Sequence, residues 1–229
     1  MTLALNDLKE FYAPIYFEEF SQHYTLTEHQ VDPTRLSEVN VTTSGSGIFI
    51  TPKFLSDCEK LFRKIDANLS FRDNNYGTFI LEQNGTQFII YVEMKSNYGA
   101  VKKKAIKQIP ISSIKIKSLL RNLQAFHPQD FKECGLIISY PPSEEDKYDS
   151  KNNEMVFDHK LNYLAVQRGC EDCIDKELRN KKKVCLKAEN FPNLPQDKLH
   201  DDIKFKEMMV YHCSVSGNGD TVDLDAIFH

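Results

Sequence analysis

Residues 78–95, TFILEQNGTQFIIYVEMK, decide the fold of this chain. They consist of two β-rich segments around the Asn-Gly pair at 84–85, which is the strongest short signal for a two-residue hairpin turn. The second segment is apolar on both faces over residues 88–92, so we expect it to lie in the interior of a sheet. Glu93 and Lys95, two charged residues at the end of such a strand, are therefore conspicuous.

The segments around the hairpin are predicted from their apolar periodicity and their caps. Thr51-Pro52 has the pattern of a helix start, and apolar residues then recur at spacings of three and four. Pro110 should end or kink the helix after the hairpin, with Ser112 or Ser113 able to cap a second segment. The predicted order is α-β-β-β-α-β, over residues 52–65, 68–73, 78–83, 86–95, 100–126 and 134–140.

The two ends of the chain flank this core. Residues 1–50 place aromatic side chains in a helix-like pattern before a Thr/Ser/Gly stretch at 42–47, which predicts one N-terminal helix and a long connection. The tail alternates polar and apolar residues near 205–215, which predicts one more strand. The expected organisation is an N-terminal helical segment and connection (1–50), a core (51–142) and a C-terminal extension packed on that core (143–229).

Composition restricts the compartment and the partners. The chain has 229 residues, of which 41% are hydrophobic, enough for one sizeable domain. Because no apolar run is long enough for a signal peptide or a membrane span, we expect a cytoplasmic protein without a membrane partner. The six cysteines are then expected to be reduced thiols or metal ligands. With a net charge of −4, any nucleic-acid site must be local.

One stretch of the chain is locally basic. Residues 102–121 contain lysines and one arginine but no acidic residue. A solvated helix face is the simpler interpretation, and contact with a phosphate backbone is the alternative. The candidate DNA contacts are Lys102, Lys103, Lys104 and Lys107.

Glu93 and Lys95 have the residue types and the spacing that phosphodiester cleavage needs. Side chains alternate along a strand, so both should project from the same face. The carboxylate could bind Mg²⁺ or Mn²⁺, and the ammonium could then orient a nucleophile or stabilise the transition state. A bare E-x-K also occurs by chance in many proteins, and the alternative is a solvent-facing ion pair at a strand end.

In this context, residues 52–140 resemble the PD-(D/E)XK nuclease superfamily, which includes many restriction and repair endonucleases. Members share an αβββαβ core in which one strand ends in E-x-K, here Glu93-Met94-Lys95, and some carry an A-x-x-Q-I-like segment on the next helix, here residues 105–109. The resemblance implies a restriction-endonuclease-like α/β fold, with a mixed central sheet flanked by helices. It also implies metal-dependent hydrolysis of DNA phosphodiester bonds.

The resemblance also implies roles for single residues. Glu93 would be a metal ligand, Lys95 the catalytic lysine and Gln108 a helper contact. Glu59 is the candidate for the acidic residue that some members carry on the first helix. Many nucleases of this type act as dimers, which makes a homodimer a partner to consider, although the sequence has no exposed heptad.

The sequence departs from the family at the first acidic residue, which is expected near the start of the strand before E-x-K. Counting back through the turn, the position opposite Glu93 falls near Tyr76 or Gly77, and neither carries a carboxylate. Asp73 could bind the metal if the strand is bulged or the loop folds inward, and Asn75 would be a weaker, neutral ligand. The alternative is a catalytically degenerate module that binds nucleic acid or a protein partner.

The C-terminal cysteines have a spacing of C-x2-C-x11-C, which could hold a structural Zn²⁺. A second C-x2-C pair is absent, and buried thiols without a metal are the alternative. Zinc would tie the C-terminal region to the core. The thiolates would come from Cys170, Cys173 and Cys185, and the fourth ligand from His200, His212 or Cys213.

Overall fold

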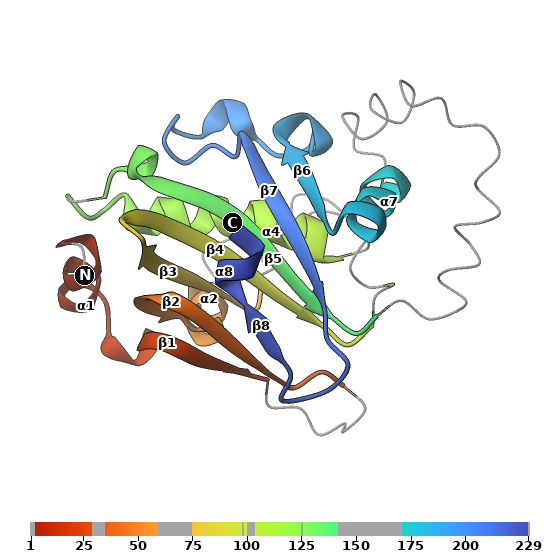
Figure 1. Cartoon of the computed structure of the whole chain (residues 1–229). Coiled ribbons are helices and arrows are strands. Elements are labelled where there is room, and N and C mark those ends of the chain that lie inside the picture. Colours follow the sequence, from red (N-terminus) through yellow and green to blue (C-terminus); the bar gives the residue numbers. More distant parts are fainter. Residues whose placement is uncertain are drawn as a thin grey trace.

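A mixed β-sheet flanked by helices organises the protein, and the computed structural model describes residues 3–28, 35–58, 75–97, 99, 104–124, 126–141 and 171–228 (Figure 1). Its strands are β1 (Phe17–Thr27), β2 (Glu38–Ile50), β3 (Gly77–Gln83), β4 (Thr86–Lys95), β5 (Phe131–Ser139), β6 (Lys183–Lys187), β7 (Glu207–Ser214) and β8 (Thr221–Asp223). Its α-helices are α1 (Leu3–Phe11), α2 (Pro52–Cys58), α4 (Ile106–Leu120), α7 (Glu171–Lys181) and α8 (Leu224–Phe228). Short 3₁₀ turns lie at Pro14–Tyr16, Pro128–Asp130, Ala188–Asn190 and Gln196–Lys198.

The strands follow the order β1-β2-β3-β4-β5-β7-β6, and β8 pairs with β2 outside this path. From β1 to β4 neighbouring strands are antiparallel. β5 then runs parallel to β4, and β7 runs parallel to β5. The α/β class and the mixed sheet predicted from the sequence are therefore confirmed.

β3 and β4 form the predicted hairpin. Their antiparallel register runs from Gly77 opposite Val92 down to the turn. Asn84 and Gly85 both have positive φ, at 50° and 73°, which a tight turn of this kind requires. β4 lies between β3 and β5 and is an interior strand, as its apolar faces predict.

α4 connects β4 to its parallel neighbour β5, and one prediction about this helix is wrong. Pro110 lies inside α4 and does not end it. The hydrogen bond that proline cannot donate would go to Ile106, the first residue of α4, and residues 104–105 just before it are π-helical. Pro110 therefore removes one backbone hydrogen bond near the start of α4, and the helix continues past it. Ser112 and Ser113 are fully buried within the helix and do not begin a second one.

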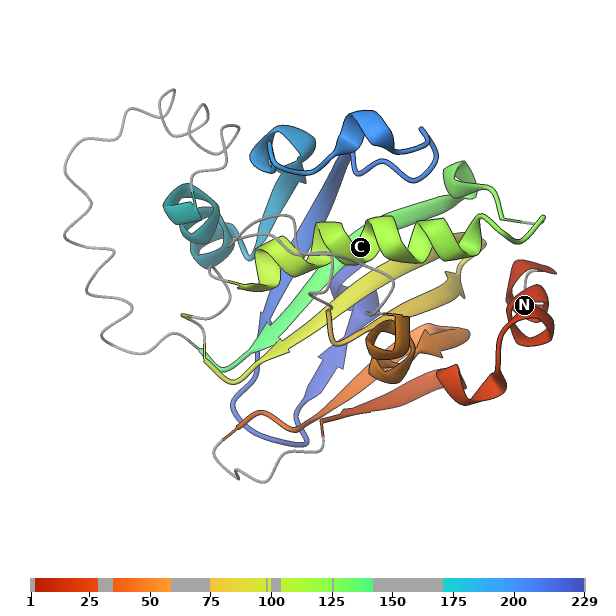
Figure 2. The ribbon, with the colours of Figure 1, turned by 180° about the vertical axis from the view of Figure 1, so that it is seen from behind.

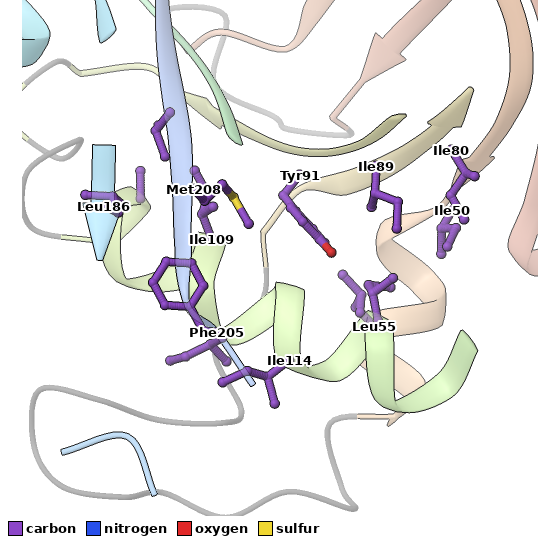
Figure 3. Close-up of a cluster of buried hydrophobic side chains, with 14 of the residues drawn as sticks. Ile50, Leu55, Ile80, Ile89, Tyr91, Ile109, Ile114, Leu186, Phe205 and Met208 are labelled. Carbon is purple, nitrogen blue, oxygen red and sulfur yellow. The ribbon is translucent and has the colours of Figure 1, made fainter. Parts of the chain in front are cut away.

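The two faces of the sheet are covered differently. On one face α2, α4 and α7 lie over the sheet (Figure 2), and their apolar side chains belong to the same buried cluster as Ile89 and Tyr91 of β4. Figure 3 shows this cluster with Leu55 of α2 and Ile109 of α4. On the other face, side chains of the β1–β2 hairpin, β8 and α8 pack against Ile90 and Val92. Since side chains alternate along β4, Glu93 follows Tyr91 on the face that the helices cover.

The prediction for residues 1–50 is wrong in its larger part. One helix is present, as α1, but most of the aromatic stretch that was predicted as helical lies in β1, and β2 occupies most of the predicted connection. The Thr/Ser/Gly stretch 42–47 lies inside β2, where a Cβ at Gly47 would overlap the Ile80 carbonyl oxygen of β3. Glycine therefore permits a close approach of two strands here and does not mark a loop. β2 is also the neighbour of β3 in the sheet, so the segment belongs to the core.

The C-terminal region joins the same sheet. The strand predicted near 205–215 is confirmed as β7, and β6 pairs with it in antiparallel register. The helix predicted over 52–65 is present as α2 up to Cys58. The remainder of that helix and the strand predicted over 68–73 lie outside the described residues. None of the described helices is long and apolar enough to cross a membrane.

Candidate functional site

The end of β4 places Glu93 and Lys95 side by side on the helix-covered face. The Lys95 ammonium donates a hydrogen bond to Glu93 Oε1 and forms an ion pair with it. Glu93 is only 4% exposed, and Lys95 is half-buried. The prediction that both share one face is confirmed, and the alternative of a solvent-facing pair is wrong for Glu93.

An open cavity of about 440 Å³ lies beside this pair and is called the Glu93 cavity below. Gln108 of α4 lines it together with Glu93 and Lys95, so the structure brings together three of the predicted site residues. The cavity is completed by the end of β1, the start of α2 and the two residues before β3. The cavity therefore lies between the N-terminal strand β1, the β3–β4 hairpin and the helices α2 and α4.

Burial makes Glu93 an unusual carboxyl group. Its pKa is raised to about 7, chiefly by burial, while the positive charge of Lys95 and its hydrogen bond oppose the rise. The nearby backbone N–H of Tyr76 also lowers the pKa, and the negative charge of Glu28 raises it. Among the described residues no group completes a hydrogen bond to Oε2. One oxygen of a buried carboxylate is thus left for a ligand.

Asn75 adds a second oxygen to the cavity wall. Its backbone N–H donates to Ser112 Oγ at 3.0 Å, and its Nδ2 donates to the Gly77 carbonyl oxygen. The bond from Nδ2 fixes the side-chain amide and identifies Oδ1 as its remaining acceptor. Asn75 is 3% exposed, and Oδ1 has no hydrogen-bond partner in the described part of the chain. The neutral ligand considered from the sequence is therefore in place.

The register of the hairpin accounts for the missing family carboxylate. Because Gly77 pairs with Val92, Tyr76 lies at the position opposite Glu93, as counted from the sequence. Tyr76 donates its hydroxyl to the Thr27 carbonyl oxygen at 2.6 Å and does not supply a carboxylate. Asp73 and Glu59, the predicted acidic candidates, lie outside the described residues.

Glu28, directly after β1, is the site residue that the sequence reasoning missed. It lines the Glu93 cavity, and its charge influences Glu93. The signal that could have found it is the alternation of Tyr24 and Leu26 with threonines at the end of β1, a strand that was interpreted as helical. Without the β1–β2 hairpin, nothing placed residue 28 near residue 93.

The basic stretch 102–121 divides between surface and interior. Lys104 is exposed and Lys107 half-buried near the start of α4, but neither lines the Glu93 cavity. Lys115 and Lys117 are buried, so a wholly solvated helix face is a wrong interpretation of this stretch. The predicted contacts Lys102 and Lys103 lie outside the described residues.

The candidate zinc ligands occupy different elements. Cys173 is buried in α7, and Cys185 is half-buried in β6. His200 is exposed, and its Nε2 lies 2.7 Å from Arg121 Nη2. No three His, Cys, Asp or Glu side chains of the described residues form a group that could hold a metal. Cys170 lies outside those residues, so zinc stays an untested prediction.

His212 of β7 lies near the same end of the sheet and gives the fold a pH dependence. Its Nε2 is 2.9 Å from Ser139 Oγ, and the ring is 3% exposed. Burial, and then the charge of Lys182, lowers the pKa of His212 from 6.5 to about 4. The folded state therefore disfavours the imidazolium, whereas the unfolded chain binds a proton below pH 6.5.

We expect the free energy of unfolding to fall as the pH drops from 6.5 to 4, with a contribution from His212 of up to about 3 kcal/mol. Urea denaturation at a series of pH values measures this slope. His212→Gln should remove that part of the slope, while His127→Gln, at an exposed position, should leave it unchanged. Equal slopes for wild type and His212→Gln would contradict the assignment.

No family model, no curated protein and no solved structure matches the chain. The geometry of Glu93, Lys95, Gln108 and Asn75 around one cavity is therefore the ground for assigning a function.

Proposed function

We propose that this protein is a metal-dependent, nuclease-like enzyme that hydrolyses DNA phosphodiester bonds at the Glu93 cavity. One observation carries the proposal: a buried carboxylate with one oxygen paired to Lys95 and the other unpartnered among the described residues, beside an open cavity. A charged carboxylate is costly to bury unless its charge is compensated. Lys95 compensates the negative charge at Glu93 Oε1, and a divalent cation bound to Oε2 would compensate the charge there.

The available donors fit a hard cation. Mg²⁺ and Mn²⁺ prefer oxygen ligands, and Mg²⁺ is commonly held by one or two carboxylates with waters and substrate phosphates completing its shell. Glu93 Oε2 and Asn75 Oδ1 are both oxygens without a hydrogen-bond partner in the described part of the chain. The open cavity leaves room for the waters and for a phosphate.

In the proposed mechanism each side chain has a defined task. When bound, the metal would lower the pKa of a water and neutralise charge on the phosphate. Glu93 would hold the cation, and the Lys95 ammonium could orient the attacking water or donate to a non-bridging phosphate oxygen in the transition state. Gln108 of α4 lines the same cavity and could contact the phosphate or the water. Lys104, exposed one turn earlier, would contact the flanking backbone.

A restriction-endonuclease-like core is part of this proposal. Its support is the run of antiparallel strands β2, β3 and β4, followed by α4 and by β5 parallel to β4. The E-x-K pair then lies at the end of the third of these strands. One difference from the expected order is that α2 lies between β2 and β3.

A degenerate, noncatalytic module that binds nucleic acid or a protein partner is the second candidate. The observation that favours it is Tyr76 at the position opposite Glu93, where the family places an acidic residue. In that case the ion pair of Glu93 and Lys95 would be purely structural. Metal binding that depends on Glu93 separates the two candidates, because only the enzyme requires it.

Cleavage of plasmid and linear DNA in the presence of Mg²⁺ or Mn²⁺ tests the enzymatic proposal. We expect the wild type to cleave, and Lys95→Ala to cleave about 100-fold more slowly, because removing one transition-state donor commonly has an effect of that size. Lys183→Ala, an exposed lysine at the start of β6, is the matched control and should cleave at the wild-type rate. If the wild type leaves all substrates intact and binds no Mn²⁺ through Glu93, the noncatalytic module is the better proposal.

A further inference from the structure

Glu28 reaches the Glu93 cavity from the N-terminal hairpin, far away in the sequence. Three hydrogen bonds order this end of the hairpin, and two of them hold it against the segment that carries the site. The Glu28 N–H donates to the Ser37 carbonyl oxygen at 2.8 Å, which closes the hairpin. The Leu36 N–H donates to Ser96 Oγ at 2.9 Å, one residue beyond β4. The position of Glu28 beside β4 is thus determined by backbone groups.

The third bond comes from the residue opposite Glu93. The Tyr76 hydroxyl donates to the carbonyl oxygen of Thr27, the residue just before Glu28. The β1–β2 hairpin is therefore hydrogen-bonded to the residue just before β3 and to the residue just after β4, close to Glu93. Tyr76, which replaces the carboxylate expected of the family, instead holds the segment that carries another one.

The negative charge of Glu28 raises the pKa of two residues that line the cavity. It raises the pKa of Glu93, and it contributes, after burial, to raising the pKa of Tyr76 to about 12. The Glu28 side chain is half-buried and makes no hydrogen bond or ion pair with any described residue. Two carboxylates that repel each other across one cavity gain stability from a cation placed between them.

Asn75 supplies an observation that is independent of the two acids. Asn75 lines the same cavity, and its side chain is almost fully buried. Its Nδ2 is bonded to the Gly77 carbonyl oxygen, and its Oδ1 has no hydrogen-bond partner among the described residues. A buried amide oxygen normally accepts a hydrogen bond, so an exception calls for an unseen donor or cation. An oxygen with this position beside two carboxylates favours a cation.

We infer that Glu28 is the second carboxylate of a divalent-cation site that it forms with Glu93 and Asn75. The inference rests on the proposed function and adds to it the origin of the missing acid. The second carboxylate then comes from the N-terminal hairpin and not from the strand paired with β4. Residues 1–50 would accordingly be required for metal binding as well as for the sheet.

Titration of the full-length protein with Mn²⁺, followed by electron paramagnetic resonance or calorimetry, tests this inference. We expect Glu28→Gln to weaken Mn²⁺ binding by about 10- to 100-fold, the range typical for residues that support a metal site. Glu28→Asp, which keeps the charge on a shorter side chain, should recover part of the affinity. Glu38→Gln is the matched control, since Glu38 is an exposed glutamate of the same hairpin that does not line the cavity.

The outcomes separate this inference from the proposed function. If Glu28→Gln binds Mn²⁺ as the wild type does while Glu93→Gln loses it, Glu28 is not a ligand and the proposed function stands. If the wild type itself binds no Mn²⁺, both are overturned. Thermal unfolding in EDTA checks that Glu28→Gln is folded, so that a loss of affinity reports on the site.

Discussion

Glu93→Gln should abolish Mn²⁺-dependent DNA cleavage, with a loss of about 1,000-fold or more, and should weaken Mn²⁺ binding by at least about 100-fold. The substitution replaces a carboxylate that is 4% exposed with a neutral amide of the same shape. The cation then loses its buried negative ligand. Lys95 keeps an acceptor at Oε1, so the local packing should persist.

The same variant should not lower the thermal stability of the protein in EDTA. A buried carboxylate that is only partly compensated by Lys95 is costly to the folded state, and glutamine carries no charge to bury. A structural ion pair predicts the opposite result, because breaking it would leave the Lys95 ammonium without its partner. Cleavage and melting temperature measured on one preparation therefore distinguish a site built for a metal from a pair built for stability. Unchanged cleavage combined with a lower melting temperature would contradict the proposed function.

The hairpin and the E-x-K pair could be predicted because their signals are local. The Asn-Gly turn at 84–85 sets the register of β3 and β4, and the alternation along β4 then determines the face of Glu93 and Lys95. Gln108 was predicted from the resemblance of residues 105–109 to the A-x-x-Q-I-like segment that some family members carry on the next helix. These three residues do line one cavity, so sequence reasoning reached the part of the site that one contiguous segment builds.

The rest of the site depends on pairings that no local pattern specifies. β2 pairs with β3 across the whole of α2 and the residues after it, and the close approach at Gly47 is visible only in that pairing. Aromatic residues in β1 also satisfy a helical period, and so the pattern did not choose between the two structures. Glu28 was missed for this reason, since its place in the cavity follows from the β1–β2 hairpin.

A second polar group on the helix-covered face supports the position of α4 over β4 and β5. Glu133 of β5 accepts hydrogen bonds at Oε2 from Tyr91 at 3.1 Å and from Ser113 Oγ at 2.9 Å. Its Oε1 lies 3.2 Å from Lys117 Nζ, which also donates to the Lys204 carbonyl oxygen at 2.9 Å. The Lys117 side chain is only 5% exposed. One carboxylate thus joins α4 to two strands and compensates a buried ammonium.

We expect Glu133→Ala to lower the free energy of unfolding by about 3 to 5 kcal/mol, the usual cost of leaving one partner of a buried ion pair uncompensated. The Tyr91 and Ser113 hydroxyls lose their acceptor at the same time, which adds to the loss. Urea denaturation monitored by circular dichroism measures it. Glu189→Ala, at an exposed position, is the control and should change stability by less than about 0.5 kcal/mol.

The double variant Glu133→Gln with Lys117→Met tests whether the stability lost in Glu133→Ala is due to the Lys117 ammonium that remains without its carboxylate. Glutamine keeps an oxygen for Tyr91 and Ser113, and methionine fills the space of the lysine stem without a charge to bury. We expect the double variant to recover most of the stability that Glu133→Ala loses, whereas Glu133→Gln alone should not. If all three variants lose the same free energy, the loss reflects packing at Glu133 and not the buried ammonium. Recovery in the double variant would show that the loss in Glu133→Ala comes from the uncompensated Lys117 ammonium, and that α4 keeps its place over β4 without the ion pair.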